Sequence, residues 1–270
     1  SLGYLGGGLL FLVNVIMFLN PQFFGIENQS NAILISFVMV AFWWAFFSIP
    51  ILRNVSESDT QKQEPRFFKA ILQSFNEVYQ TLMEVRKYKN VAIFLLAYWF
   101  YMDGIDTIVR MATAYGSDIG LEASSMITAL ILTQFVGFPS TLIFGYFADK
   151  IGFKKIISIG ILIYILISIF ASRITTATEF YLMAVVVGLV MGGVQAVSRA
   201  YFSSIIPEDK EAQFFGFYNL VGKSAVVAGP ALLAWISMIF NTPRAGILGL
   251  LILFIPGLIL LWMVPTQKDS

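Results

Sequence analysis

Cysteine and histidine are both absent from this chain of 270 residues. Their absence excludes disulfides, thiolate and imidazole metal ligands, Cys or Ser/His nucleophile systems, and histidine proton relays. Charged side chains are also scarce, at 12% of the residues against about 25% in soluble domains. Proton or charge chemistry must therefore use Asp, Glu, Lys, Arg, Tyr or water, and we expect no metal and no cofactor.

The few charges nearly cancel, since 17 Lys and Arg stand against 16 Asp and Glu. No overall basic field exists to attract nucleic acid, so nucleic-acid binding is excluded as a function. Hydrophobic residues make up 58% of the chain, more than the remaining polar residues can cover in water. The first partner that the composition predicts is therefore a lipid bilayer.

Eight stretches have the roughly 17 to 25 apolar residues that a helix needs to cross a bilayer. They are apolar on all sides, unlike the alternating strands of a membrane barrel, so the expected fold is an all-α bundle. The spans are Gly3 to Leu19, Asn31 to Leu52, Val91 to Tyr115, Ser125 to Phe147, Ile156 to Ser172, Phe180 to Ser203, Gln213 to Ile239 and Pro243 to Val264.

Basic residues in the connections predict which ends of these helices face the cytoplasm. Twelve lie on one side and only Arg173 and Arg244 on the other. By the positive-inside rule, the long connection after the second span and the C-terminus are cytoplasmic. We therefore expect a multi-pass protein, of the bacterial inner membrane, with both of these segments inside the cell.

The long connection divides the chain into two spans before it and six after it. Residues 54–90 begin polar and then place Phe67, Phe68, Ile71, Leu72, Phe75, Val78, Tyr79, Leu82 and Met83 three to four residues apart, behind Pro65. This spacing predicts an amphipathic helix that lies on the membrane surface or under the bundle, with a regulatory docking site as the alternative.

Six-helix blocks joined by a cytoplasmic connection are typical of transporters built from repeats. We interpret residues 1–53 as the last two helices of an N-terminal half, 91–265 as a complete C-terminal half, and 266–270 as a cytoplasmic tail. The chain begins with Ser1 and without a signal region, so we expect it to be a fragment whose partner is about four further N-terminal helices.

The loop after the fourth span carries a glycine, an aspartate with a basic neighbour, a second glycine and two more basic residues. These are Gly145, Asp149, Lys150, Gly152, Lys154 and Lys155. The pattern resembles the cytoplasmic signature of the major facilitator superfamily. The resemblance implies a helical bundle of that fold and a gate at this loop, and we expect Asp149 to meet Arg199 near the end of the sixth span.

The third span contains Asp103, Asp106 and Arg110, spaced so that all three lie on one face of a helix. Each costs about 2.5 to 3.5 kcal/mol in the middle of a bilayer, so they must face partners or a watery cavity. Asp106 and Arg110 can pair and lock the helix to a neighbour, but Asp103 is then left over. The superfamily resemblance places this helix on the central cavity, and we predict Asp103 as the proton carrier.

Other polar side chains inside the spans complete the predicted substrate and coupling site. Lys223 of the seventh span lies at a similar predicted depth to Asp103 and could pair with it either as a switch or as a fixed salt bridge. Asn219 is one turn away on the same side of that span. Gln134 and Gln195 could bond a substrate or merely a neighbouring helix. Gly216, Ala225 and Gly229-Pro230 partly resemble the superfamily's antiporter motif, but a packing kink explains them as well.

Strings such as YMDGIDTIVRMATAYG and EAQFFGFYNLVGKS resemble the branch of this superfamily that holds the fungal vacuolar amino-acid effluxers. The resemblance implies a secondary transporter of a small polar metabolite, such as an amino acid, coupled to protons by alternating access. One alternative is an intramembrane aspartyl hydrolase, which needs two facing carboxylates, whereas Asp103 and Asp106 share one helix. A sensor or scaffold on the same fold, with no transport activity, is the other.

Overall fold

Helices form every regular element of the computed structural model within the residues that it describes, 2–55 and 67–265; side chains are described for residues 3–55 and 76–265. Seven helical segments of this part are long and apolar enough to cross a membrane, and Gly3–Leu19 is a shorter apolar helix. The chain is therefore an integral, multi-pass, all-α membrane protein, as its composition predicts. Pro65 lies outside the described residues.

The chain separates into two compact units, one from Leu2 to Gln73 and the other from Ser74 onward. In the first, α1 (Leu2–Leu19) packs against α2 (Gln29–Asn54), with the short 3-10 helix η1 (Pro21–Phe24) between them. Asn28 ends the turn before α2 and accepts a hydrogen bond from the Asn31 N–H at 2.9 Å. This side chain replaces a partner that the first turn of a helix lacks.

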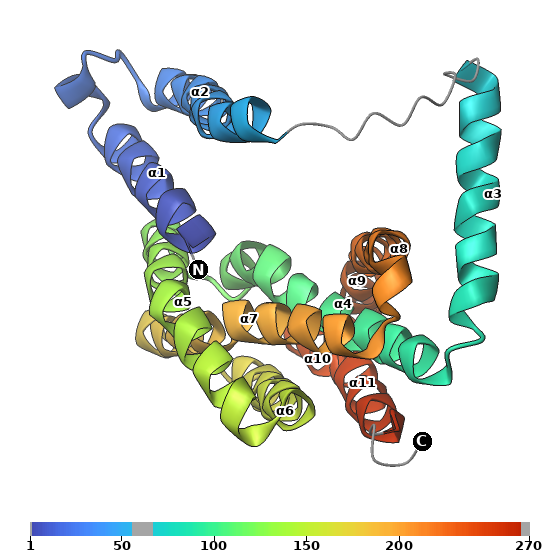
Figure 1. The fold of residues 1–270 in the computed structure, drawn as a ribbon. Coiled ribbons are helices and arrows are strands. Elements are labelled where there is room, and N and C mark those ends of the chain that lie inside the picture. The colour runs from blue at the N-terminus through green and yellow to red at the C-terminus, as the bar shows by residue number, and fades with distance from the viewer. Residues whose placement is uncertain (1, 56–66, 266–270) are drawn as a thin grey trace. The chain divides into compact units, whose positions relative to one another are not determined.

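The second unit places α4 (Lys89–Asp118) at its centre, where it packs against α7, α8, α9 and α11 (Figure 1). Of its candidate spans, α4 has the largest buried share, and apolar and aromatic side chains surround it. The other helices of the unit are α3 (Phe67–Val85, in part), α5 (Ala123–Ile151), α6 (Phe153–Ala171), α7 (Ala177–Ile205), η2 (Glu208–Lys210), α8 (Glu211–Ser224), α9 (Ala228–Phe240), α10 (Pro243–Gly249) and α11 (Leu251–Met263). The polar residues Asp103 and Thr107 of α4 are therefore held inside the bundle by their neighbours.

The seventh and eighth predicted spans are each interrupted rather than continuous. The seventh breaks at residues 225–227 into α8 and α9, and the eighth breaks at Leu250 into α10 and α11. Pro230 explains the first break, because it has no N–H to donate to the Val226 carbonyl and its ring would clash with that carbonyl. Pro230 instead occupies the first turn of α9, where a missing N–H costs little.

Candidate functional site

The centre of the candidate site is Asp103, which is fully buried on α4. Its Oδ1 accepts a hydrogen bond from the backbone N–H of Gly229 at 2.9 Å. Its Oδ2 is also buried and has no hydrogen-bond partner among the described residues. A carboxyl group with one satisfied and one unsatisfied oxygen in an apolar bundle is costly to hold ionised, which makes Asp103 the first candidate for a functional side chain.

The break before α9 explains why a backbone N–H is free to meet Asp103. The first N–H groups of any helix lack partners within that helix, and they form the positive end of its dipole. Gly229 is in the first turn of α9, and no side chain near Val227 caps that turn. Asp103 therefore serves as the cap of α9 from a different helix, with its carboxylate at the positive end.

Gly229 lies so close to α4 that no side chain fits there. A Cβ at this position would overlap the Thr107 hydroxyl, and it would lie 2.8 Å from Asp103 Oδ1 and 3.0 Å from the Asp103 carbonyl oxygen. Thr107 donates its own hydroxyl proton to the Asp103 carbonyl at 2.6 Å. The glycine of the antiporter-like pattern therefore brings the backbone of α9 directly onto the acid.

The other ionisable groups of α4 become progressively more exposed beyond Asp103. Asp106 is half-buried and Arg110 is exposed. In the part of the chain that the structure describes, neither forms an ion pair within 4.0 Å. The predicted lock between Asp106 and Arg110 is therefore not closed in this structure, although the two lie one helical turn apart.

Lys223 does not meet Asp103, and that predicted pairing is wrong for this structure. Gly229, six residues further along, occupies the position opposite the acid, and Lys223 is exposed on α8. Equal residue counts from the predicted ends of the two spans did not give equal depth in the bundle. The neighbour of Lys223, Gly222, indicates its depth in the bundle. A Cβ at Gly222 would lie 3.0 Å from the hydroxyl of Tyr98, and Tyr98 precedes Asp103 on α4 by more than one turn.

The remaining predicted site residues lie on three different helices. Asn219 is exposed on α8, while Gln134 of α5 and Gln195 of α7 are half-buried. Neither glutamine forms a side-chain hydrogen bond to another described residue that would explain it as a contact between helices. These three positions stay predictions as substrate groups, because nothing in their contacts tests that role.

The loop with the superfamily pattern is reduced to a single residue, Gly152, which joins α5 to α6. Gly152 has φ +98°, a backbone conformation that favours glycine. Lys154 donates hydrogen bonds to the carbonyl oxygens of Trp262 at 3.0 Å and Val264 at 2.7 Å, at the end of α11. A lysine at the negative end of a helix is favourable, so part of the pattern fastens α6 to α11.

The basic and acidic residues around that turn are otherwise on the surface. Lys150 donates to the hydroxyl of Tyr146, one turn back on α5, while Asp149 and Lys155 are exposed and Gly145 is half-buried. The expected pair of Asp149 with Arg199 does not form. Arg199 is exposed and lies over the ring of Phe215 of α8 instead, 5.3 Å from its centroid.

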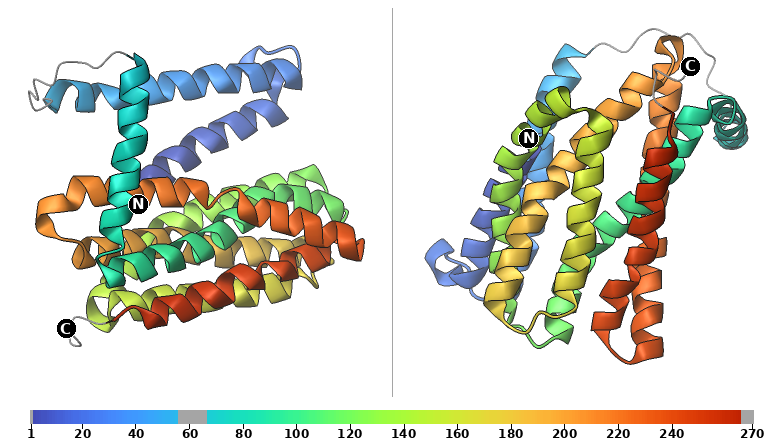
Figure 2. Two further views of the ribbon diagram at one scale, coloured as in Figure 1. Left: turned by 90° about the vertical axis from the view of Figure 1, so that its right-hand side faces the viewer. Right: turned by 90° about the horizontal axis from the view of Figure 1, so that it is seen from below.

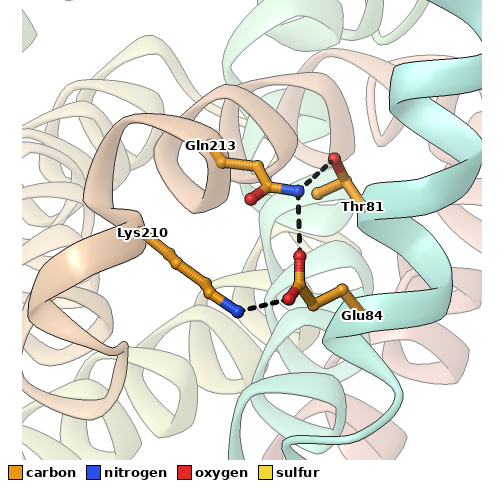
Figure 3. A network of polar contacts seen from close by, with 4 residues as sticks. All are labelled: Thr81, Glu84, Lys210 and Gln213. Atoms are coloured by element: carbon orange, nitrogen blue, oxygen red, sulfur yellow. Dashed lines mark hydrogen bonds and ion pairs between the residues drawn. The ribbon is translucent and has the colours of Figure 1, made fainter.

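Sequence reasoning missed a polar cluster that joins α3 to the start of α8 (Figure 3). Glu84 forms an ion pair with Lys210 and accepts a hydrogen bond from Gln213 Nε2 at 3.1 Å, and Gln213 also donates to Thr81 Oγ1 at 2.9 Å. We call these four residues the α3–α8 clasp. The sequence carries only a weak signal for this cluster. The positive-inside rule places Glu84 and Lys210 on the same side of the membrane, but no local sequence pattern pairs the two residues.

The Lys210–Glu84 contact is the one ion pair found between side chains of residues 3–55 and 76–265. Hydrogen bonding from Lys210, followed by that from Gln213 and the charges of Lys210 and Lys87, outweighs desolvation and lowers the pKa of Glu84 below its ordinary value. Glu84 is therefore ionised at neutral pH, the charge state that its ion pair with Lys210 requires.

Comparison with known proteins identifies the family. The family model described as "Vacuole effluxer Atg22 like" matches residues 1–270, the whole chain. The chain belongs to this Atg22-like family. It is 36% identical over 271 residues to the uncharacterized MFS-type transporter YxiO of Bacillus subtilis (strain 168), covering all of this chain and 63% of that protein.

Fungal members of the Atg22-like family are more distant. The chain is 23% identical over 257 residues to autophagy-related protein 22 of Kluyveromyces lactis, covering 88% of this chain and 51% of that protein. It is 25% identical over 261 residues to the protein of the same name from Eremothecium gossypii, covering 88% of this chain and 49% of that protein. The chain thus spans about half the length of these fungal relatives. These matches confirm two predictions from the sequence: the major facilitator fold and the effluxer-like branch.

Proposed function

We propose that this chain is the C-terminal part of a secondary transporter that moves a small polar metabolite, with amino-acid efflux as the specific reaction, coupled to protons through Asp103. The observation that carries the proposal is the buried carboxyl group of Asp103, with Oδ1 on the Gly229 N–H and Oδ2 unpartnered. The name of the bacterial relative, an MFS-type transporter, and the effluxer family support transport as the activity.

A proton suits this site better than a metal ion or a bound metabolite. The backbone of Gly229 lies against Asp103 and Thr107 without room for a Cβ, whereas a proton needs no added volume. The first-turn N–H and the helix dipole favour the charged carboxylate, while the unpartnered oxygen in an apolar environment favours the neutral acid. Because these two influences oppose each other, the protonation state of Asp103 changes when water enters or leaves the site during alternating access.

Substrate contact is proposed for the exposed polar residues of α4 and α8. Arg110, Asn219 and Lys223 cannot face hydrocarbon at low cost, so their surface must face water or another part of the protein. In a transporter made of two halves, that surface faces the central cavity, where the two cations would bind a carboxylate of the metabolite. Asp106, Gln134 and Gln195 are half-buried polar residues of the spans and would complete the site.

The experiment uses the full-length protein in proteoliposomes. Common amino acids are screened for stabilisation of the purified protein, and the one that stabilises it most is used as the labelled substrate. We expect Asp103→Asn to lose accumulation driven by a pH gradient while it retains exchange of labelled for unlabelled substrate. The amide keeps the shape and an oxygen for the Gly229 N–H, but it carries no titratable proton.

Asp118→Asn is the matched control, since Asp118 is an exposed residue at the end of α4, away from the α4–α9 contact. This variant should accumulate substrate like the unmodified protein. Undiminished accumulation by Asp103→Asn would contradict the proton-carrier role. Loss of both accumulation and exchange, with unaltered stability, would assign Asp103 to substrate binding instead.

A further inference from the structure

Helix α3 presents two different faces, of which only one is used by the rest of its unit. Thr81 and Glu84 point toward α8 and form the α3–α8 clasp, and Val85 beside them is buried (Figure 3). Tyr88, just beyond the helix, extends this contact, because its ring packs edge-on against Phe214 at 5.6 Å between centroids. This face holds the end of α3 against the first turn of α8.

The other face carries a stripe of large apolar side chains without a partner. We call it the α3 stripe: Val78, Tyr79, Leu82 and Met83, which are 42%, 56%, 37% and 41% exposed. At about 100° per residue, these four lie within one side of the helix and the clasp residues lie on the opposite side. Such an exposed stripe needs an apolar environment to cover it.

The direction of α3 indicates where that environment is. Its described part from Ser74 runs crosswise to α4 and α7 and lies beside the end of the bundle at which α4 and α8 begin (Figure 2). Helix α3 is also not among the segments apolar and long enough to cross a membrane. A helix perpendicular to the spans, at their ends, lies in the plane of the membrane surface.

Three exposed cations stand beside the stripe. Arg86 and Lys87 follow directly after α3, and Lys89 begins α4. Their aliphatic stems can lie along apolar surface while the charged groups reach outward, which suits the phosphate level of a bilayer. Anionic headgroups carry the charge that complements these cations. They are concentrated in the cytoplasmic leaflet, on the side where the positive-inside rule places this segment.

We propose that the α3 stripe inserts into the surface of an anionic membrane leaflet, with Arg86, Lys87 and Lys89 on the headgroups, and that the α3–α8 clasp transmits the position of α3 to α8. The occupant of the stripe is thus lipid rather than another part of the protein. Helix α8 ends at the break before α9, so a shift of α3 reaches the helix whose continuation is capped by Asp103.

The test places a fluorescent label on each face of α3 in the full-length protein. These 270 residues contain no cysteine. Any cysteine in the rest of the full-length protein is first replaced by Ser, so that Met83→Cys and Glu77→Cys each create a single labelling site for bimane. The proteins are reconstituted in nanodiscs of phosphatidylcholine and phosphatidylglycerol in equal parts, with brominated lipid as quencher. We expect the label at position 83 to be quenched at least about twofold more strongly than the label at position 77, which is exposed and faces the opposite way.

A second arm tests the headgroup charge. Quenching at position 83 should weaken in nanodiscs of phosphatidylcholine alone, and equally in the anionic nanodiscs when Arg86, Lys87 and Lys89 are replaced by Gln. Quenching of position 83 by neither brominated lipid nor aqueous iodide would show that protein covers the stripe, and the proposal would be wrong. Equal quenching in neutral and anionic lipid would also overturn it. These readouts do not depend on transport, so they stand apart from the test of Asp103.

Discussion

Asp103 of α4 accepts a hydrogen bond from the N–H of Gly229, in the first turn of α9, at 2.9 Å. The contact joins the one fully buried carboxyl group among the described residues to the point where a membrane helix is broken. Because the two oxygens of Asp103 have different surroundings, a change in its charge changes the cap of α9. A proton and the position of a helix are thereby linked through a single backbone group.

Replacing Gly229 with Ala should destabilise the protein and impair the site. The added methyl group would overlap the Thr107 hydroxyl and approach Asp103 Oδ1, so α9 must move away from α4. We expect a loss of about 1 to 3 kcal/mol in stability. Gly216→Ala is the control, since a Cβ at Gly216 has no neighbour within 4 Å. Thermal unfolding of both variants measures this, and equal melting temperatures would show that the contact is looser than described.

The two glycines of the loop pattern should respond in opposite ways to alanine. Gly152 has φ +98°, so Gly152→Ala should cost about 1 to 3 kcal/mol through backbone strain. Gly145 lies within α5 with open space around it, and Gly145→Ala should stabilise by about 0.5 to 1 kcal/mol. Thermal unfolding distinguishes the two variants. A change in melting temperature of the same sign in both would contradict the assignment of Gly152 alone to the positive-φ turn.

A buried hydrogen bond between α4 and α7 should behave as a coupled pair. The hydroxyls of Tyr101 and Ser198 are 2.7 Å apart, and both residues are fully buried. Tyr101→Phe or Ser198→Ala alone should cost about 1 kcal/mol or more, because each leaves a buried hydroxyl without a partner. The double variant should cost less than the sum of the two. Strict additivity in a double-mutant cycle would indicate that the hydroxyls do not bond.

The clasp should weaken only in acid. The pKa of Glu84 is lowered in the folded protein, so its contribution is present above the ordinary carboxyl pKa and is lost as pH falls through the lowered value. The coupling between Glu84→Gln and Lys210→Gln should therefore be constant from about pH 6 to about pH 8 and should be lost only in acid, below the ordinary carboxyl pKa of about 4.3. Glu77→Gln, exposed on the same helix face, is the control. A coupling that changes around neutral pH would contradict this assignment.

Sequence patterns predicted the helices well because a bilayer demands long apolar segments. The apolar runs gave the spans to within a few residues, and the charge asymmetry predicted a sidedness that awaits a test. Asp103 stood out because an acid inside a span is rare and costly. Its partner could not be predicted, because the Gly229 N–H becomes available only when Pro230 breaks the helix. Residue counts from the predicted ends of the spans pointed to Lys223 instead.

Contacts between distant segments were the other part that sequence reasoning could not reach. Arg199 was expected to meet Asp149, but the position of α8 decides that it lies over Phe215. Lys154 looked like part of a gate, and its hydrogen bonds to the end of α11 follow only from how α6 and α11 pack. Glu84 carried no local pattern at all, and its ion pair with Lys210 depends on where α3 lies.

Proton movement measured directly is the sharpest test of the role of Asp103. Proteoliposomes that contain the full-length protein and a trapped pH-sensitive dye are given the transported amino acid without an imposed pH gradient. The account predicts a pH change inside the vesicles with the unmodified protein and none with Asp103→Asn, although labelled substrate still exchanges in that variant. A substrate-driven pH change of normal size in Asp103→Asn would contradict the account.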